Sequence, residues 1–381
     1  MAPIHSYVIA STLNQMVNLL PLLIDFQDIA IDSKIYNITL LGENGTKLED
    51  NARWDDNFKK CLKELLPEKE FDIIDIAVQS NFLENLDDIT KAIAPVIKGN
   101  LPLLWNITGG QRHYLFTIDQ VIQSLYEGAH KVFYLDGNHG KIYWMKGSSS
   151  KKDYKLDTNK LKIIHALKLM GFTQAGYKNS GERTTGLGMQ LWERYKEDET
   201  LRIAFIKSNK KDGTLEEVYN LLEDNVDLCN FIRQFESKEF PFGYILEEMV
   251  VDTIQQSCSG FLEIAHSAKI KFETGSVIDE FDILLLTRTG QVINFECKSG
   301  FMSSDVAKST RYSTYAIGGV YGLPILITPL IKKEIQKVKT SNEPDYANIK
   351  ASVMAAGRAN LLCWGIDEII ENTKNKLNST K

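Results

Sequence analysis

The sequence lacks the features that would place it in a membrane or outside the cell. In its 381 residues no apolar run approaches the ~20 residues that a membrane-spanning helix needs. The N-terminus, Met-Ala-Pro-Ile-His, has neither the basic stretch nor the small-residue cleavage site of a secretory signal. We therefore expect a cytoplasmic protein with no membrane span.

Cysteine is scarce and never paired in a C-x-x-C motif. The cysteines are also odd in number and widely scattered, so the sequence indicates neither a disulfide framework nor a structural zinc site. The thiols are expected to be reduced and mostly buried. The five residues concerned are Cys61, Cys229, Cys258, Cys297 and Cys363.

A large excess of positive charge is also missing, because the net charge is −6. Proteins that coat nucleic acid depend on many Lys and Arg contacts to phosphates, so any nucleic-acid contact should be local or conditional. The first strand-to-helix turn lacks the G-x-G-x-x-G fingerprint, and no G-x-x-x-x-G-K-[ST] loop occurs. These absences disfavour NAD binding and ordinary nucleoside triphosphate hydrolysis.

Strand and helix signals alternate through the first 145 residues. Near-continuous apolar strands alternating with helices are typical of a parallel sheet covered on both faces, so we expect an α/β, Rossmann-like domain. The predicted strands are Ser6–Ala10, Ile35–Leu41, Phe71–Val78, Leu101–Ile107 and Lys131–Leu135, and the predicted helices are Asn14–Ile24, Phe58–Leu66, Phe82–Ile97 and Tyr114–Glu127.

Polar and small residues follow the strands of this predicted sheet, where ligands bind in such folds. The first strand is followed by Ser11-Thr12-Leu13-Asn14-Gln15, and the fourth by Thr108-Gly109-Gly110-Gln111-Arg112. Glycines, a hydroxyl and a cation before a helix favour an anion, which predicts a phosphate-bearing ligand. The alternative is a tight turn at the two glycines with Thr108 as a helix cap.

The middle of the chain, residues 146–235, begins with the small polar run Gly147-Ser148-Ser149-Ser150. Helical apolar spacing follows at Asn159–Gly171 and Leu215–Phe235. We interpret this segment as a mostly helical connector between a sensor domain, residues 1–145, and an effector domain, residues 236–381.

Residues 277–300 carry the most informative chemistry. Predicted strands Phe281–Leu286 and Gln291–Glu296 flank the turn Thr287-Arg288-Thr289-Gly290, which indicates a β-hairpin. In that hairpin Asp282 would lie beside Glu296 and Lys298, which share a face because they are two residues apart. Two carboxylates beside an ammonium are suited to holding Mg²⁺ or Mn²⁺ for phosphodiester hydrolysis.

A predicted helix at Gly243–Ile254 could bring a further acid to this place. Glu247 is the first choice as a metal ligand and Glu248 the second, because the apolar stripe of the helix then packs on the sheet. The alternative is that Glu296 and Lys298 form only an exposed ion pair, worth ~0–1 kcal/mol. Downstream, Lys308 and Arg311 with neighbouring tyrosines could hold a single strand or be an ordinary helix surface.

Asp282 and Glu296-Cys297-Lys298 resemble the motif of PD-(D/E)xK nucleases, with Glu247 as the helix acid, although no proline precedes Asp282. Together with the segments after the first and fourth strands, nearly the whole chain resembles the CRISPR-associated Rossmann-fold (CARF) nucleases of type III CRISPR systems.

This resemblance implies a homodimer that binds a cyclic oligoadenylate, most often cyclic tetra-adenylate, and then cuts DNA, RNA or both with Mn²⁺ or Mg²⁺. By position, Ser11, Thr12, Asn14 and Gln15 would contact the ligand from one side, and Thr108, Gly109, Gly110, Gln111 and Arg112 from the other. Catalysis would fall to Glu247, Asp282, Glu296 and Lys298. Two rival functions stay open: a ligand-controlled regulatory protein with an inactive nuclease fold, and a restriction or repair nuclease that needs no activator.

Overall fold

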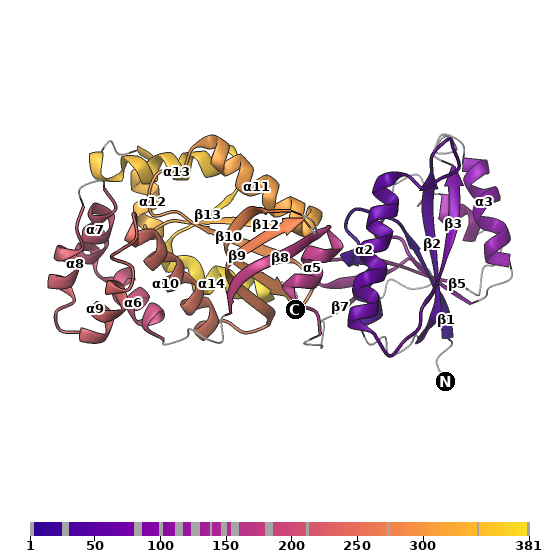
Figure 1. Ribbon diagram of the computed structural model, residues 1–381, viewed down its shortest axis with the longest axis horizontal. Helices are drawn as coiled ribbons and strands as arrows, with labels where there is room; N and C mark the ends of the chain where they lie inside the picture. The colour runs from indigo at the N-terminus through magenta and orange to yellow at the C-terminus, as the bar shows by residue number, and fades with distance from the viewer. Residues whose placement is uncertain are drawn as a thin grey trace.

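The computed structural model shows two β-sheets, each covered by helices, arranged side by side along the long axis of the molecule (Figure 1). Its helices and strands confirm the α/β class. The structure describes residues 4–24, 30–79, 86–98, 102–110, 117–122, 130–137, 139–145, 151–153, 160–179, 186–210, 213–272, 275–340 and 343–378.

The first sheet has the strand order β3-β2-β1-β4-β5-β6-β7, and β1 to β5 are parallel. The predicted parallel core is therefore present, and the strand order reverses between the neighbouring strands β1 and β4, as in a doubly wound fold. The strands are β1 (Ile4–Ala10), β2 (Ala30–Leu41), β3 (Asp72–Gln79), β4 (Leu103–Asn106), β5 (His130–Asp136), β6 (Lys141–Trp144) and β7 (Lys151–Asp153).

Apolar side chains cover both faces of this sheet. On one face, residues of α1 (Met16–Leu23) and α2 (Glu49–Leu65) pack with Tyr7 and Phe133. On the other face, α3 (Leu86–Lys98) and helical residues 117–122 pack with Val8 and Trp105. Burial on both faces explains why these strands are near-continuous apolar runs. Two predicted helices, Phe82–Ile97 and Tyr114–Glu127, lie partly outside the described residues.

The second sheet has the order β13-β12-β11-β10-β9-β8. The pairs from β8 to β11 are antiparallel, and those from β11 to β13 are parallel. The strands are β8 (Phe172–Asn179), β9 (Phe261–Phe272), β10 (Val277–Thr287), β11 (Val292–Cys297), β12 (Leu323–Ile327) and β13 (Leu362–Trp364).

Helices surround this second sheet, and one large apolar core joins α6 to α10 with β10, β11 and β12. The helices are α5 (Ile163–Leu169), α6 (Leu187–Glu197), α7 (Glu199–Ser208), α8 (Glu216–Leu221), α9 (Val226–Arg233), α10 (Pro241–Ser257), α11 (Ser304–Gly318), α12 (Lys332–Thr340), α13 (Ala347–Arg358) and α14 (Ile369–Asn378), with short 3-10 turns η3 (Gly319–Tyr321), η4 (Pro344–Tyr346) and η5 (Ile366–Glu368).

The segment 146–235 contains two strands that its sequence did not predict. β7 pairs with β6 at the edge of the first sheet, and β8 pairs with β9 at the edge of the second. Both strands are rich in polar residues, as edge strands often are, so neither has the apolar alternation of a half-buried strand. This segment therefore contributes to both sheets, and the boundaries at 145 and 235 stay predictions.

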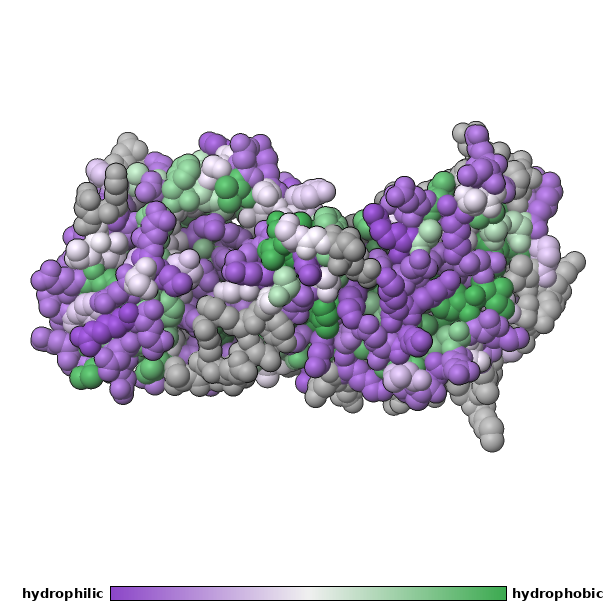
Figure 2. Space-filling model, in the orientation of Figure 1, coloured by the Kyte–Doolittle hydropathy of each residue, from purple (hydrophilic) through white to green (hydrophobic). Residues whose placement is uncertain are grey.

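The two halves of the molecule share part of their apolar interior. Leu19 and Leu20 of α1 belong to the same buried cluster as Leu284, Leu286 and Val292 of the hairpin. The surface on the face shown in Figure 2 is mostly hydrophilic, with apolar residues in scattered groups. Among the described residues, no helix has the length and apolar character needed to cross a membrane.

Candidate functional site

The polar loops after β1 and β4 meet at the carboxyl edge of the first sheet. A Cβ at Gly109 would lie 2.8 Å from Cγ2 of Thr12, so a glycine is needed for this close approach. Gly110 has a φ of 96°, which glycine also tolerates best. The structure thus brings Ser11 and Thr12 beside Gly109 and Gly110. This proximity was predicted, because the two segments follow strands of the same parallel sheet.

Other residues predicted to bind the ligand serve the interior of this edge. Gln15 is fully buried, and its Oε1 accepts a 2.7 Å hydrogen bond from Nδ2 of Asn18. Thr108 Oγ1 accepts a 2.8 Å hydrogen bond from the backbone N–H of Leu135. These contacts fix the loops rather than present the side chains to a ligand. Gln111 and Arg112 lie outside the described residues.

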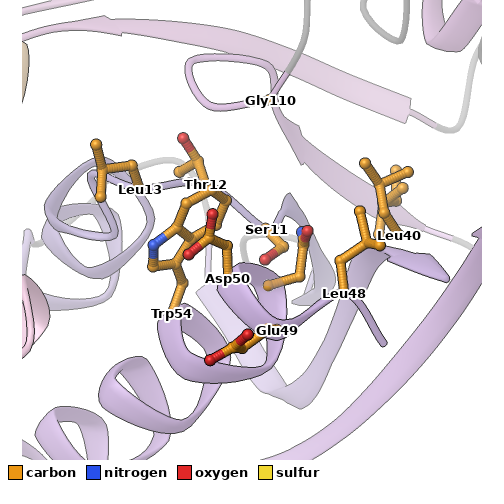
Figure 3. Close-up of a pocket in the computed structure, with 11 residues that line it drawn as sticks. Ser11, Thr12, Leu13, Leu40, Leu48, Glu49, Asp50, Trp54 and Gly110 are labelled. Atoms are coloured by element: carbon orange, nitrogen blue, oxygen red, sulfur yellow. The ribbon is translucent and has the colours of Figure 1, made fainter. Parts of the chain in front are cut away.

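A pocket of about 580 Å³ opens beside the loop after β1. This size falls within the ~300–1,000 Å³ of typical small-molecule sites. Figure 3 shows Asp50 and Trp54 reaching from α2 towards Ser11 and Thr12, with Leu40 and Leu48 along another side. The residues from α2 were not among those predicted from sequence, because the predicted helix begins at Phe58 whereas α2 begins at Glu49.

The second candidate site lies on the predicted hairpin, whose existence the structure confirms. Ile283 pairs with Phe295, so the neighbouring residues Asp282 and Glu296 lie opposite each other on the antiparallel strands β10 and β11. Asp282 Oδ2 accepts a 2.7 Å hydrogen bond from the backbone N–H of Cys297. Lys298 Nζ lies 2.6 Å from Oε1 of Glu296.

Burial and like charge raise the pKa of Asp282 well above its usual range. Loss of solvation is the largest cause, and the charges of Glu296 and Glu247 add to it. The pKa of Lys298 is raised despite burial, because Glu296 and Asp282 stabilise its ammonium. Lys298 therefore carries a proton at neutral pH, which suits it to stabilise negative charge rather than to accept a proton.

The acid from α10 is held by a histidine that the sequence analysis did not select. His266 Nε2 on β9 lies 3.2 Å from Oε2 of Glu247, and His266 Nδ1 lies 3.8 Å from Oε1 of Glu248. Glu247 is also the acid whose charge acts on Asp282, which favours it over Glu248 as the helix acid. The adjacent Ser267, which lies opposite Asp282 on β9, has a φ of 49°, a left-handed conformation that is uncommon for residues other than glycine.

These carboxylates offer the oxygen ligands that hard divalent cations prefer, and their mutual repulsion would be relieved by a cation. They are not preassembled around one: in the described part of the chain, no group of three or more His, Cys, Asp or Glu side chains is already arranged to hold a metal ion. Glu296 is paired with Lys298, and Asp282 with the Cys297 N–H. Metal binding would therefore require these side chains to rearrange.

Comparison with known proteins supports the fold over nearly the whole chain. No model of a known protein family matches, and neither does any curated protein. Among solved structures, protein VC1899 from Vibrio cholerae matches with a TM-score of 0.67 and 16% identity, covering 99% of this chain and 98% of its own. Can2 from Sulfobacillus thermosulfidooxidans, solved in complex with cyclic tetra-adenylate, matches with a TM-score of 0.61 and 14% identity, covering 98% and 99%. The chain therefore has the fold that these two proteins share.

Proposed function

We propose that this protein is a metal-dependent nuclease that a cyclic oligoadenylate, most readily cyclic tetra-adenylate, switches on in type III CRISPR defence. The observation that carries the proposal is the meeting of Asp282, Glu296 and Lys298 on one hairpin, with Glu247 close enough to influence Asp282. All three carboxylates are at least partly buried. Such a grouping is costly for stability, which favours a functional reason for it.

In this proposal the first sheet forms a CARF sensor domain and the second a PD-(D/E)xK nuclease domain. Can2 shares the fold and was solved with cyclic tetra-adenylate, which supports that molecule as the activator. The loops after β1 and β4 would hold it, with Ser11, Thr12 and Gly110 at the pocket. A homodimer of cytoplasmic chains would pair two such loops around one symmetric ligand.

Asp282, Glu296 and Glu247 would hold Mn²⁺ or Mg²⁺, which when bound supplies Lewis-acid stabilisation to a phosphodiester. Lys298, kept protonated by its acidic neighbours, would stabilise the charge that develops on the phosphate. Glu247 would be oriented by His266. Nothing in this arrangement distinguishes a deoxyribose from a ribose, so DNA and RNA are both proposed substrates.

The test is cleavage of labelled single-stranded DNA, RNA and supercoiled plasmid with Mn²⁺ or Mg²⁺, with and without cyclic tetra-adenylate. We expect cutting only with both metal and activator, and a loss of at least about 100-fold in the Glu296→Gln variant. Asp305→Asn is a matched control, because Asp305 is almost fully exposed on α11 and pairs only loosely with Lys308 at 3.4 Å. Cutting without activator would instead support a constitutive nuclease.

A regulatory protein without nuclease activity is the second candidate. It is favoured by one observation: Lys298 already pairs with Glu296, and the backbone N–H of Cys297 already donates to Asp282. Binding of cyclic tetra-adenylate with no cutting under either metal would support this candidate and contradict the nuclease.

A further inference from the structure

We propose that the pocket between the loop after β1 and the start of α2 receives an adenine base of the activator, and that Asp50 recognises the exocyclic amino group of that base. This inference rests on the proposed function, because it assigns one part of the ligand to one part of the sensor domain. It goes further by naming a residue that selects adenine.

The acids at the start of α2 make this pocket a poor place for the phosphates of the ligand. Glu49 and Asp50 occupy the first turn of α2, where the helix dipole would otherwise attract an anion. Lys47, two residues before the first residue of α2, is turned to Asp55 and Asp75, with its Nζ 2.8 Å from an oxygen of each. Arg53 pairs with one oxygen of Asp50, so the wall from α2 presents Glu49 and the second oxygen of Asp50, which disfavour phosphate and attract a hydrogen-bond donor.

The shape and lining of the pocket suit a flat heterocycle. Trp54 offers an aromatic surface, and Leu40 and Leu48 offer apolar ones (Figure 3). Aromatic side chains bind nucleic-acid bases by stacking whatever the base, so this wall alone would not select adenine. Selection needs polar groups that fit one pattern of donors and acceptors.

Two such groups have no partner within the described structure. Ser11 is 9% exposed, and its buried Oγ makes no hydrogen bond to the residues that the structure describes. The buried Nε1 of Trp54 is likewise unpaired among those residues. Buried polar atoms are rarely left without a partner, so each of these two atoms has a hydrogen bond to offer to a ligand or a water.

Adenine fits this combination better than guanine or hypoxanthine does. Adenine places an amino donor next to a ring-nitrogen acceptor, whereas guanine places a carbonyl oxygen next to that nitrogen. A hydroxyl donor at Ser11 can serve the ring nitrogen, and a carboxylate at Asp50 can accept from the amino group. Arg53 Nη2 lies 2.7 Å from Oδ1 of Asp50, which leaves Oδ2 for the ligand.

The experiment measures binding by titration calorimetry of cyclic tetra-adenylate and of cyclic tetra-inosinate, in which a carbonyl replaces each amino group. The full-length protein is compared with Asp50→Asn, Trp54→Phe and the control Asp56→Asn, which changes an exposed acid on the same helix. We expect the wild-type protein to bind the adenylate about tenfold more tightly than the inosinate. The reason is that the inosinate has no amino group and so loses one hydrogen bond to the charged Asp50.

In Asp50→Asn that preference should shrink or reverse, because an amide can donate to the carbonyl of hypoxanthine. Trp54→Phe should weaken both ligands by a similar factor, since stacking is kept and one donor is lost. Asp56→Asn should match the wild type. Unchanged affinities for both ligands in Asp50→Asn would overturn the inference and leave the proposed function intact. If the wild-type protein binds neither ligand, the proposed function itself is wrong.

Discussion

Asn14 and Gly319 are in contact across the two halves of the molecule. A Cβ at Gly319 would lie 2.8 Å from Nδ2 of Asn14, and Gly319 has a φ of 61°. Asn14 belongs to the loop that we propose as a ligand site, and Gly319 follows the last residue of α11. A Cβ at Gly290 would likewise lie 3.0 Å from Leu20 of α1. The loop after β1 and the helix α1 therefore pack directly on elements that flank Asp282 and Glu296.

Gly319→Ala is expected to destabilise the protein and to change how strongly the activator stimulates cutting. The added methyl would collide with Asn14 and would force a side chain into a left-handed conformation, at a cost of about 1–3 kcal/mol. Thermal unfolding measures the first effect, and the ratio of cutting with and without cyclic tetra-adenylate measures the second.

Gly357→Ala is the matched control, because this glycine lies in α13 and a Cβ there would meet nothing within 4 Å. In a helix this change should stabilise by about 0.5–1 kcal/mol. Equal stimulation ratios in Gly319→Ala and Gly357→Ala would argue against coupling through this contact.

Asp282→Asn is expected to stabilise the metal-free protein while abolishing its cutting. Because the folded-state pKa of Asp282 is raised, the folded protein holds this proton more tightly than the unfolded chain does. The ionised carboxylate therefore costs stability, and the cost grows as the pH rises from about 4. An uncharged amide that still accepts from the Cys297 N–H removes that cost.

The gain should be about 0.5–2 kcal/mol at neutral pH, or about 2–4 °C in melting temperature per kcal/mol. Melting curves with a chelator from pH 4 to pH 8 measure it. The difference between variant and wild type should vanish towards pH 4. A variant that melts below the wild type at neutral pH would show that Asp282 is not strained by its neighbours.

The hairpin could be predicted from sequence because everything that defines it is local. Alternation sets the face of each side chain, and the short turn sets the register that places Asp282 opposite Glu296. The strands of the first sheet were equally clear, since burial on both faces makes them apolar throughout. In the hairpin, the residues that define the structure are close in sequence. In the first sheet, the positions of the loops follow from the order of the strands.

The missed features depend on contacts that are distant in sequence. His266 meets Glu247 only because β9 pairs with β10 beneath α10, and a single histidine in a strand carries no signal of that. The beginning of α2 was missed because Glu49 to Asn57 is almost entirely polar, so helical periodicity appears only from Phe58. For the same reason, Glu49, Asp50 and Trp54 were not predicted to line the pocket.

The largely buried ion pair between Arg202 of α7 and Glu334 of α12 is expected to hold these two helices together. Arg202 Nη2 lies 2.7 Å from Glu334 Oε1 on α12, and Arg202 also donates to the backbone oxygens of Tyr195 and Lys196. Arg202→Ala would leave the partly buried Glu334 carboxylate with only the backbone N–H of Ile331 as a partner, at a cost of up to about 3 kcal/mol.

Chemical denaturation of the variant measures this cost. Lys210→Ala is the comparison, because Lys210 forms an exposed pair with Asp345 whose loss should cost at most about 1 kcal/mol. Equal losses in the two variants would mean that burial adds nothing to the Arg202 pair. A large loss in Arg202→Ala alone would show that the helices before residue 235 are part of the stable core of the second half of the chain.

If the protein is the nuclease proposed above, His266 is expected to set its metal requirement by holding Glu247. Residues that orient a metal ligand typically change metal affinity by about 10–100-fold when removed. His266→Ala should therefore raise the Mn²⁺ concentration for half-maximal cutting by about tenfold or more, and His266→Gln, which keeps a donor, should recover part of the loss. Direct titration of Mn²⁺ without substrate should show the same order of affinities: the wild type binds most tightly, His266→Gln less tightly and His266→Ala least tightly.

His139→Ala is the control, because His139 lies in the first half of the molecule, paired with Asp136. A Mn²⁺ midpoint in His266→Ala equal to that of the control would mean that Glu247 needs no support from β9.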